Sequence, residues 1–281
     1  MDIFVFFLVL CSSFIHAFWN FISKKVSGNL QVTITGLWIA NLSLLPFSLF
    51  LVSKYGLDIQ GLKFIIITAV GYGFYFLLLN LSYKVGDIST VYPISRGTGV
   101  AGTAILAYIY LHEAFSNIGV YGIILVFLGI ILISLKKKLL NADLKPIFYA
   151  IALGLTVVLY TINDKQGVSY IFPVIYINFR NLLALVVMSP FVFRKGLPVI
   201  KEVLTQKLKY ALIIGYGVVG SYLLILFAYR SANVGYITPL REFSVVIGTA
   251  LGVIFLKEKL TAGKVIGILF ITTGLFFIKL S

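Results

Sequence analysis

One segment of this sequence occurs twice, and both copies are apolar stretches interrupted by residues that hydrocarbon penalises. The first copy, residues 88–113, reads Ile-Ser-Thr-Val-Tyr-Pro-Ile-Ser-Arg-Gly before a long apolar run. The second, residues 234–259, carries Thr-Pro-Leu-Arg-Glu at the matching place and Lys-Glu-Lys at its end. Pro93 maps onto Pro239, and the Gly-Thr-Ala of one copy onto that of the other, at one offset of 146 (239 − 93). The duplication predicts two similar structural units, with helices bent near each proline.

The composition around the repeat is that of a membrane protein. Hydrophobic residues make up 60% of the 281 residues, charged residues only 11%, and the mean hydropathy is +1.05. These values exclude a soluble globular domain, and a chain of this length accommodates about ten spans of roughly 20 residues. The net charge of +14 arises in short loops, where basic residues orient a chain in the bilayer, so nucleic-acid binding is not expected. The single cysteine, Cys11, excludes an intramolecular disulfide.

Apolar runs bounded by charged or turn residues divide the chain into two sets of five expected spans, joined by a polar connector over residues 136–146. Because each set has an odd number of spans, the second set enters the membrane from the opposite side. The sequence therefore predicts an all-α polytopic membrane protein with ten transmembrane helices, arranged as two inverted five-helix repeats over residues 1–138 and 139–281. The expected spans lie near residues 3–23, 30–53, 62–83, 88–111, 117–135, 146–163, 172–193, 210–229, 234–256 and 263–280.

The first expected span carries polar side chains on one face. His16 and Asn20 are four residues apart and share a helix face, with Trp19 beside them. We expect this face to line a cavity; the alternative is a hydrogen bond between helices. A metal site is not expected, because His112 is the only other histidine and no cysteine or carboxylate cluster accompanies it.

The sixth expected span repeats part of this pattern. Tyr160 stands where Trp19 stands and Lys165 where Lys24 stands, at one offset of 141 (160 − 19 = 165 − 24). Asp164 is expected near the membrane boundary. It either contributes to the cavity or pairs with Lys165 at a solvated helix end.

Three arginines are expected within spans: Arg96, Arg180 and Arg241. Glu242 is expected to be the only carboxylate well inside a span, and it can pair with Arg96 or Arg180 across the bundle. This count leaves a surplus of two positive charges within the bilayer, where an unpaired charge is costly. The surplus either belongs to a structural network or attracts an anionic group of a substrate, for which the arginine fork is suited.

A glutamate closes each copy of the repeat. Glu113 maps onto Glu258, here at an offset of 145. A carboxylate at a helix C-terminus opposes the helix dipole. We therefore expect these glutamates to cap the following helix or to form an ion pair with Lys257 or Lys259, in a structural role.

The two copies together resemble a known family. The patterns Tyr-Pro-Ile-Ser-Arg-Gly…His-Glu…Gly…Gly and Thr-Pro-Leu-Arg-Glu…Lys-Glu-Lys…Gly…Gly are similar to the two EamA domains of the drug/metabolite transporter superfamily. The resemblance implies a ten-helix bundle whose central cavity exchanges access between the two membrane faces. It also implies cavity positions at Trp19, Arg96, Tyr160 and Arg241. Family members usually keep both termini in the cytoplasm, whereas the excess of basic residues in the loops on the other face favours termini outside.

The resulting expectation is a multi-pass secondary transporter of the cell membrane. Its substrate would be a small amino acid-like, acidic or otherwise zwitterionic metabolite, transported by alternating access, either with coupled protons or without them. Arg96 and Arg241 would meet the acidic group, and Glu242 or His16 would carry the proton. His16, Asn20 and Arg180 complete the expected substrate contacts, together with the positions that the resemblance implies.

The alternative function is a flippase for a lipid or polyprenyl-phosphate-linked headgroup. A membrane enzyme is disfavoured because the sequence offers no aspartate cluster and only two histidines, and a channel because no filter sequence accompanies the arginines. No cofactor is expected. The expected partners are the small-molecule substrate and the lipid bilayer. A monomer suffices to build the cavity, and a dimer is possible.

Overall fold

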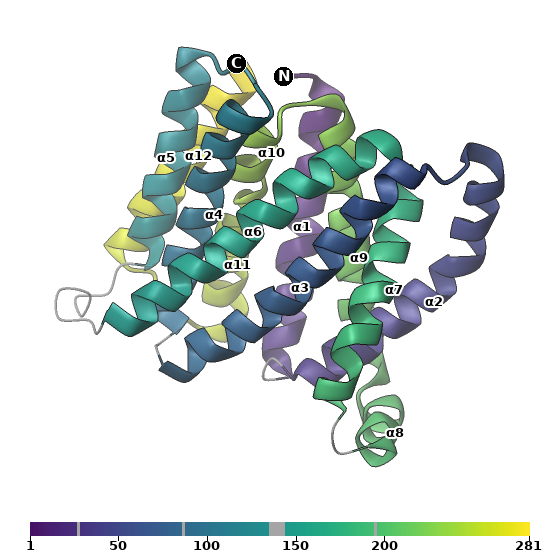
Figure 1. Cartoon of the computed structure of the whole chain (residues 1–281). Helices are drawn as coiled ribbons and strands as arrows, with labels where there is room; N and C mark the ends of the chain where they lie inside the picture. The colour runs from purple at the N-terminus through teal and green to yellow at the C-terminus, as the bar shows by residue number, and fades with distance from the viewer. Residues whose placement is uncertain (27–28, 86–87, 135–143, 194–195) are drawn as a thin grey trace.

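The computed structural model describes residues 1–26, 29–85, 88–134, 144–193 and 196–281, and within these ranges the chain is helical, without a strand (Figure 1). The helices are α1 (Ile3–Lys25), α2 (Leu30–Tyr55), α3 (Ile59–Val85), α4 (Ile88–Tyr110), α5 (Asn117–Ser134), α6 (Leu144–Tyr170), α7 (Pro173–Val192), α8 (Leu197–Gln206), α9 (Leu208–Ser231), α10 (Val234–Arg241), α11 (Phe243–Leu256) and α12 (Ala262–Leu280).

The helices have the length and composition of membrane spans. Among the described residues, 7 helical segments are long and apolar enough to cross a bilayer, and shorter apolar helices cover Ile59–Tyr75 and Asn117–Ile133. Large apolar side chains such as Phe4, Phe50 and Phe148 are exposed on the outside of the bundle, where a soluble protein would expose polar groups. The prediction of an all-α polytopic membrane protein is confirmed.

The packing of the helices has an internal two-fold pattern. The helices of the two repeats correspond in chain order: α1 to α6, α2 to α7, α3 to α9, α4 to α10–α11, and α5 to α12. Three helices pack against their own counterparts, namely α5 against α12, α2 against α7, and α4 against α10. The remaining large contacts form matched pairs, since α3 packs on α6 as α9 packs on α1. Figure 1 shows α1 beginning at the end of the molecule where both termini lie and α6 beginning at the opposite end. The arrangement is that of inverted repeats. The predicted boundary between residues 138 and 139, like the lysine-rich start of the connector, lies outside the described residues.

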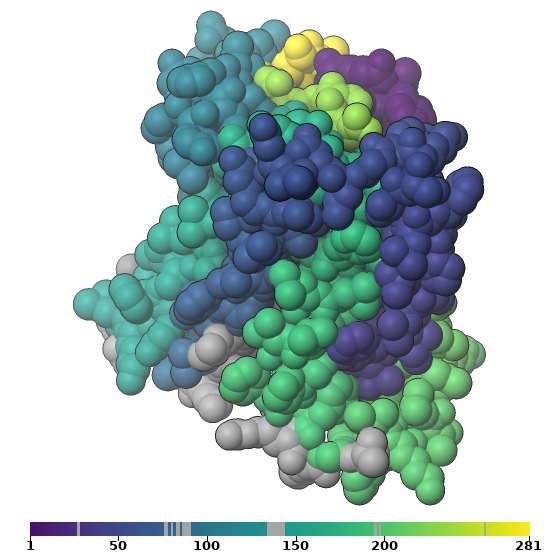
Figure 2. Space-filling model, turned by 45° about the vertical axis from the view of Figure 1, so that its right-hand side comes forward, coloured from purple at the N-terminus to yellow at the C-terminus, as the bar shows by residue number. Residues whose placement is uncertain are grey.

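Besides the continuation of α6 to Tyr170, the structure differs from the expected spans in two further places. The ninth span is two helices, because α10 ends at Arg241 and α11 begins at Phe243, and Glu242 occupies the break. A short helix that the sequence analysis did not predict, α8, precedes α9; it begins with Pro198 in its first turn and buries Val203 against the ends of α1 and α2. Figure 2 shows α8 at the lower rim, at the end opposite the two termini.

Duplicated glycines bring α5 and α12 together, and the two helices lie side by side in Figure 1. A Cβ atom built on Gly129 would lie 2.7 Å from the carbonyl oxygen of Gly267, and one built on Gly122 would lie 2.7 Å from that of Gly274. Only a residue without a side chain permits this backbone approach. The duplicated glycines therefore meet crosswise: Gly122, which is equivalent to Gly267, faces Gly274, and Gly129, which is equivalent to Gly274, faces Gly267.

We expect Gly129→Val to lower the free energy of unfolding by about 1–3 kcal/mol, because the added methyl groups would separate α5 from α12. Thermal unfolding of the purified protein measures the loss. Gly73→Val is the matched control, since no atom of the described residues outside its own stretch of helix lies within 4 Å of a Cβ built on Gly73. Equal losses for the two variants would mean that the close contact between α5 and α12 does not account for the effect at Gly129.

Candidate functional site

The break in the ninth span places a carboxylate opposite an arginine of the fourth. Glu242 lies between α10 and α11, and its side chain is 4% exposed. The Arg96 guanidinium from α4 binds it with two atoms: Nη2 lies 2.8 Å from Oε1, and Nε donates to Oε2 at 3.1 Å. Of the two partners that the sequence analysis left open for Glu242, the structure selects Arg96.

A second carboxylate is buried in the bundle, and here the sequence analysis was wrong. Asp164 is fully buried and forms an ion pair with Arg180 of α7, with 2.8 Å between Arg180 Nη1 and Asp164 Oδ2. The hydroxyls of Tyr176 and Tyr222 each donate to Asp164 at 2.6 Å, and that of Thr68 donates at 2.7 Å. Glu242 is therefore not the only carboxylate inside a span, and Asp164 does not form a solvated pair with its neighbour in sequence.

The error arose from the length of α6. The helix was expected to end near residue 163, but it continues to Tyr170. The polar side chains near its end remain inside the bundle because other helices supply their hydrogen-bond partners. The Asn163 amide donates to the carbonyl of Phe64 at 2.7 Å, and Asp164 accepts from three hydroxyls and from Arg180. Lys165 turns away and donates to the carbonyl of Ala232 at 2.9 Å. Tertiary partners, which local sequence does not reveal, thus set the helix end.

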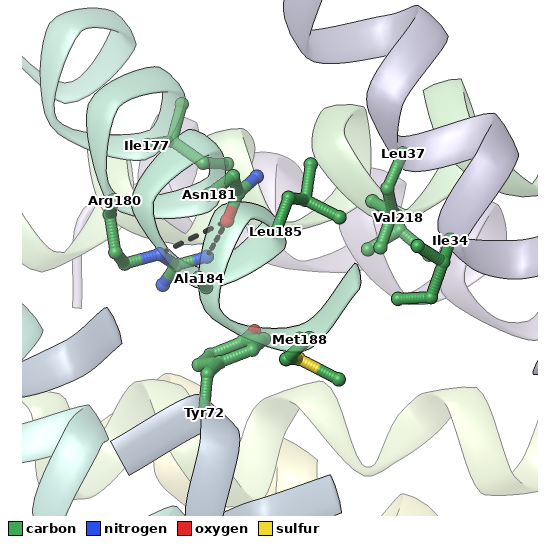
Figure 3. A pocket seen from close by; sticks show the side chains of 10 residues that line it. All are labelled: Ile34, Leu37, Tyr72, Ile177, Arg180, Asn181, Ala184, Leu185, Met188 and Val218. Carbon is green, nitrogen blue, oxygen red and sulfur yellow. Dashed lines mark hydrogen bonds between the residues drawn. The ribbon is translucent and has the colours of Figure 1, made fainter. Parts of the chain in front are cut away.

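Each nitrogen of the Arg180 guanidinium has a hydrogen-bond partner. Its Nη2 and Nε donate to the side-chain oxygen of Asn181 at 2.8 and 3.2 Å, and its guanidinium lies between the rings of Tyr72 and Tyr222, 4.6 and 4.7 Å from their centroids. Arg180 also borders a small cavity, shown in Figure 3. Its volume of about 20 Å³ has room for about one water molecule. The cavity is lined by Ile34, Leu37, Tyr72, Ile177, Arg180, Asn181, Ala184, Leu185, Met188 and Val218.

Arg241 differs from the other two arginines. It forms no ion pair with any carboxylate of the described residues. Its guanidinium lies 5.1 Å from the ring centroid of Tyr222, and its Nη2 lies 3.3 Å from Nδ1 of His16. Its Nε is buried and has no hydrogen-bond partner within the described ranges. Of the three arginines, only Arg241 thus keeps an unbalanced charge, and the surplus is one positive charge and not the two that the sequence analysis counted.

Aromatic side chains connect Arg241 to both halves of the bundle. The ring of Tyr160 lies 5.2 Å from that of Tyr72 and 6.5 Å from that of Tyr222, which also contacts Arg241. On the other side, His16 meets the indole of Trp19 edge-on at 5.0 Å. The indole Nε1 of Trp19, like Arg241 Nε, is buried without a partner in the described part of the chain.

The structure does not bring every predicted residue to this place. Trp19, His16, Tyr160 and Arg241 form one cluster through these contacts. The Asn20 side chain is exposed and donates to the carbonyl of His16 in its own helix at 2.7 Å, so it does not join the cluster.

Asp164 was missed as the partner of Arg180. The signal available in the sequence was its position one helical turn after Tyr160, which places the two residues on one face of α6.

Comparisons with known proteins identify the family and the fold. The EamA-like transporter family matches the chain twice, over residues 3–135 and 144–280. The multidrug resistance protein EbrB of Bacillus subtilis (strain 168) is 35% identical over 68 residues, which are 24% of this chain and 58% of that protein. EbrB of Bacillus atrophaeus is 36% identical over 62 residues, 22% of this chain and 53% of that protein. The chain thus spans little more than half the length of these relatives.

A solved crystal structure, described only as that of a protein, shares the fold over the whole chain. Its TM-score is 0.79, the alignment covers 98% of its own chain, and 10% of the residues are identical. At this identity the likeness concerns the fold alone. The two family matches span both halves of the helical bundle, and members of that family are membrane transporters of small molecules and not enzymes. This chain belongs to the EamA-like transporter family.

Proposed function

We propose that this protein is a secondary transporter of the cell membrane that moves a small organic acid or zwitterion by alternating access, and that Arg241 binds the substrate carboxylate. The observation that carries the proposal is the contrast between the three buried arginines. Arg96 and Arg180 have carboxylate partners, whereas Arg241 has none among the described residues. An unpaired guanidinium inside a bilayer is costly, and a bound anion would remove that cost.

The hydrogen-bonding groups near Arg241 support an anionic ligand. Within the described ranges, Arg241 Nε and Trp19 Nε1 are buried donors without an acceptor, and both residues contact His16. Such donors are satisfied by an acceptor group of a ligand, and a carboxylate supplies two oxygens. One unpaired cation matches one carboxylate, so a monocarboxylate or an amino acid fits better than a dicarboxylate.

The contact between His16 and Arg241 supports coupling to protons. A proton on His16 is opposed by the guanidinium 3.3 Å away, unless an anion lies beside both groups. A bound carboxylate would therefore favour protonation of His16, and the proton would favour the carboxylate. Glu242, the other predicted proton carrier, is already held by two atoms of Arg96. We therefore assign the coupled proton to His16.

Thermal unfolding of the wild-type protein with a panel of compounds tests the substrate class. The panel contains monocarboxylates, amino acids, dicarboxylates, quaternary amines, cationic dyes and a short-chain lipid phosphate. A ligand at about 100 times its dissociation constant adds about 2.7 kcal/mol to the free energy of unfolding and raises the Tm by roughly 5–10 °C. We expect this shift from a monocarboxylate or an amino acid. A shift from cations alone would indicate a drug exporter, one from the lipid phosphate alone would indicate a flippase, and either would contradict the proposal.

A further inference from the structure

The two repeats end their fourth spans in the same backbone turn. His112 and Lys257, equivalent at the offset of 145, both have a left-handed backbone with φ of 54°. The next residue in each repeat is a glutamate whose N–H bonds a carbonyl six residues back: Glu113 to Ala107 at 3.0 Å and Glu258 to Gly252 at 3.1 Å. The backbone therefore places the two carboxylates in equivalent positions.

The carboxylates nevertheless bind different groups. The Glu113 oxygens accept from the backbone N–H groups of Val234 and Gly235 at 2.8 and 3.1 Å, so Glu113 caps the first turn of α10. This helix belongs to the other repeat, and the expectation that Glu113 would cap the following helix was wrong. The contact is buried, since Glu113 is 8% exposed. A carboxylate at a helix N-terminus satisfies free N–H groups and interacts favourably with the dipole.

Glu258 instead meets two lysines. Its carboxylate lies 2.5 Å from Nζ of Lys24 and 3.1 Å from Nζ of Lys264, and its side chain is 36% exposed. The neighbouring residues that were expected to pair with it, Lys257 and Lys259, do not provide these contacts. Hydrogen bonds from Lys24 and Lys264 hold the pKa of Glu258 below its ordinary value, so the group is charged at neutral pH.

The equivalent lysines Lys24 and Lys165 show the same asymmetry. Lys165 donates to the carbonyls of Tyr229 and Ala232, at the C-terminal end of α9. Together, Lys165 and Glu113 hold the connection between α9 and α10 from both sides, at the end of the molecule where the termini lie (Figure 1). At the opposite end, Lys24 and Glu258 bind each other.

We infer that Glu113 and Glu258 alternate as helix caps during transport, each closing one face of the membrane; the inference rests on the proposed transport by alternating access. In the structure Glu113 caps α10 and closes the face of the termini. In the other state Glu258 leaves Lys24 and caps α4 at Ile88, the residue equivalent to Val234 (234 − 146), and Glu113 is released from α10. Inverted repeats support this step, because exchanging the conformations of the two halves produces the opposite-facing state from the same sequence.

Disulfide formation between introduced cysteines tests the inference without any ligand, and so independently of the proposed substrate. The background is Cys11→Ser, which removes the one native cysteine. The first pair, Ala114→Cys with Asn233→Cys, reports the closed face of the termini, where the Asn233 amide donates to the Ala114 carbonyl at 3.0 Å. The second pair, Ile88→Cys with Lys259→Cys, reports the opposite face. Lys259 is equivalent to Ala114 (114 + 145), and Ile88 directly follows the position equivalent to Asn233 (233 − 146 = 87).

Losing a helix cap costs about 1 kcal/mol, which corresponds to about a fivefold change in the population of a state. Glu113→Gln should therefore slow oxidation of the first pair about fivefold and accelerate that of the second. Glu258→Gln should slow oxidation of the second pair by a similar factor. Glu202→Gln, which removes an exposed carboxylate of α8 that pairs with Lys207, is the matched control and should change neither rate.

If Glu113→Gln does not fold, Glu258→Gln still decides, because its side chain is partly exposed and its removal leaves the core intact. Oxidation rates of the second pair that stay within twofold of the parent in Glu258→Gln would show that the carboxylate has a static role, and the inference would be wrong. A static cap would lower the Tm without changing the ratio of the two rates, whereas the alternating cap changes that ratio.

Discussion

Arg180→Met is expected to lower the free energy of unfolding by about 3–5 kcal/mol, because it leaves the carboxylate of Asp164 charged, buried and without its cation. Asp164 is fully buried, and its remaining partners are neutral hydroxyls, which cannot replace a guanidinium. Arg180 also fills the space between two tyrosine rings, so its loss removes packing as well. Unfolding of the purified protein by heat or denaturant measures the effect.

The double variant Arg180→Met with Asp164→Leu is the control for this prediction. It removes both charges, so the loss should be smaller than for Arg180→Met alone, although Tyr176 and Tyr222 lose their acceptor. A Tm of Arg180→Met equal to that of the wild type would show that Asp164 is not charged in the folded protein, and our description of the pair would be wrong.

Arg241→Gln, in contrast to Arg180→Met, is expected to weaken substrate binding without lowering the stability of the protein. The wild-type guanidinium has no carboxylate partner among the described residues, so its removal should leave the Tm unchanged or raise it. Affinity for the substrate should fall about 10- to 100-fold, because a hydrogen bond to a charged group contributes about 1.5–3 kcal/mol. The Tm with and without ligand gives both quantities in one series.

Arg230→Gln is the matched control for that variant. Arg230 lies at the end of α9, is exposed, and contacts the ring of Phe172 and no described group of the candidate site. It should change neither the Tm nor the ligand-induced shift. Loss of stability in Arg241→Gln comparable to that in Arg180→Met would show that Arg241 belongs to the structural network.

The sequence was sufficient to predict features that repeat or that hydropathy determines. The offset between Pro93 and Pro239 reveals the duplication, and the odd number of spans in each copy implies their inversion. The charge of Arg96 in an apolar segment implies a partner, and Glu242 was the one carboxylate expected well inside a span. These inferences depend on energetic penalties of the bilayer that act on single residues.

Features that depend on contacts between distant helices were not predictable in the same way. Asp164 follows an apparent helix end, and only the hydroxyls of other helices show that it lies inside. Glu113 caps α10 of the opposite repeat and not the next helix in the chain. The pairing of Arg180 with Asp164, and hence the isolation of Arg241, follows only from the packed structure.

Uptake into proteoliposomes tests the central claim most directly. The labelled compound is the carboxylate or amino acid that most stabilises the wild-type protein, and uptake is measured with and without an imposed proton gradient. We predict that the wild type accumulates the compound and that the gradient increases accumulation. At a substrate concentration below saturation, Arg241→Gln should lower uptake by about 10- to 100-fold, while Arg230→Gln should not change it. Equal uptake by Arg241→Gln and the wild type would contradict the assignment of Arg241 as the residue that binds the substrate carboxylate.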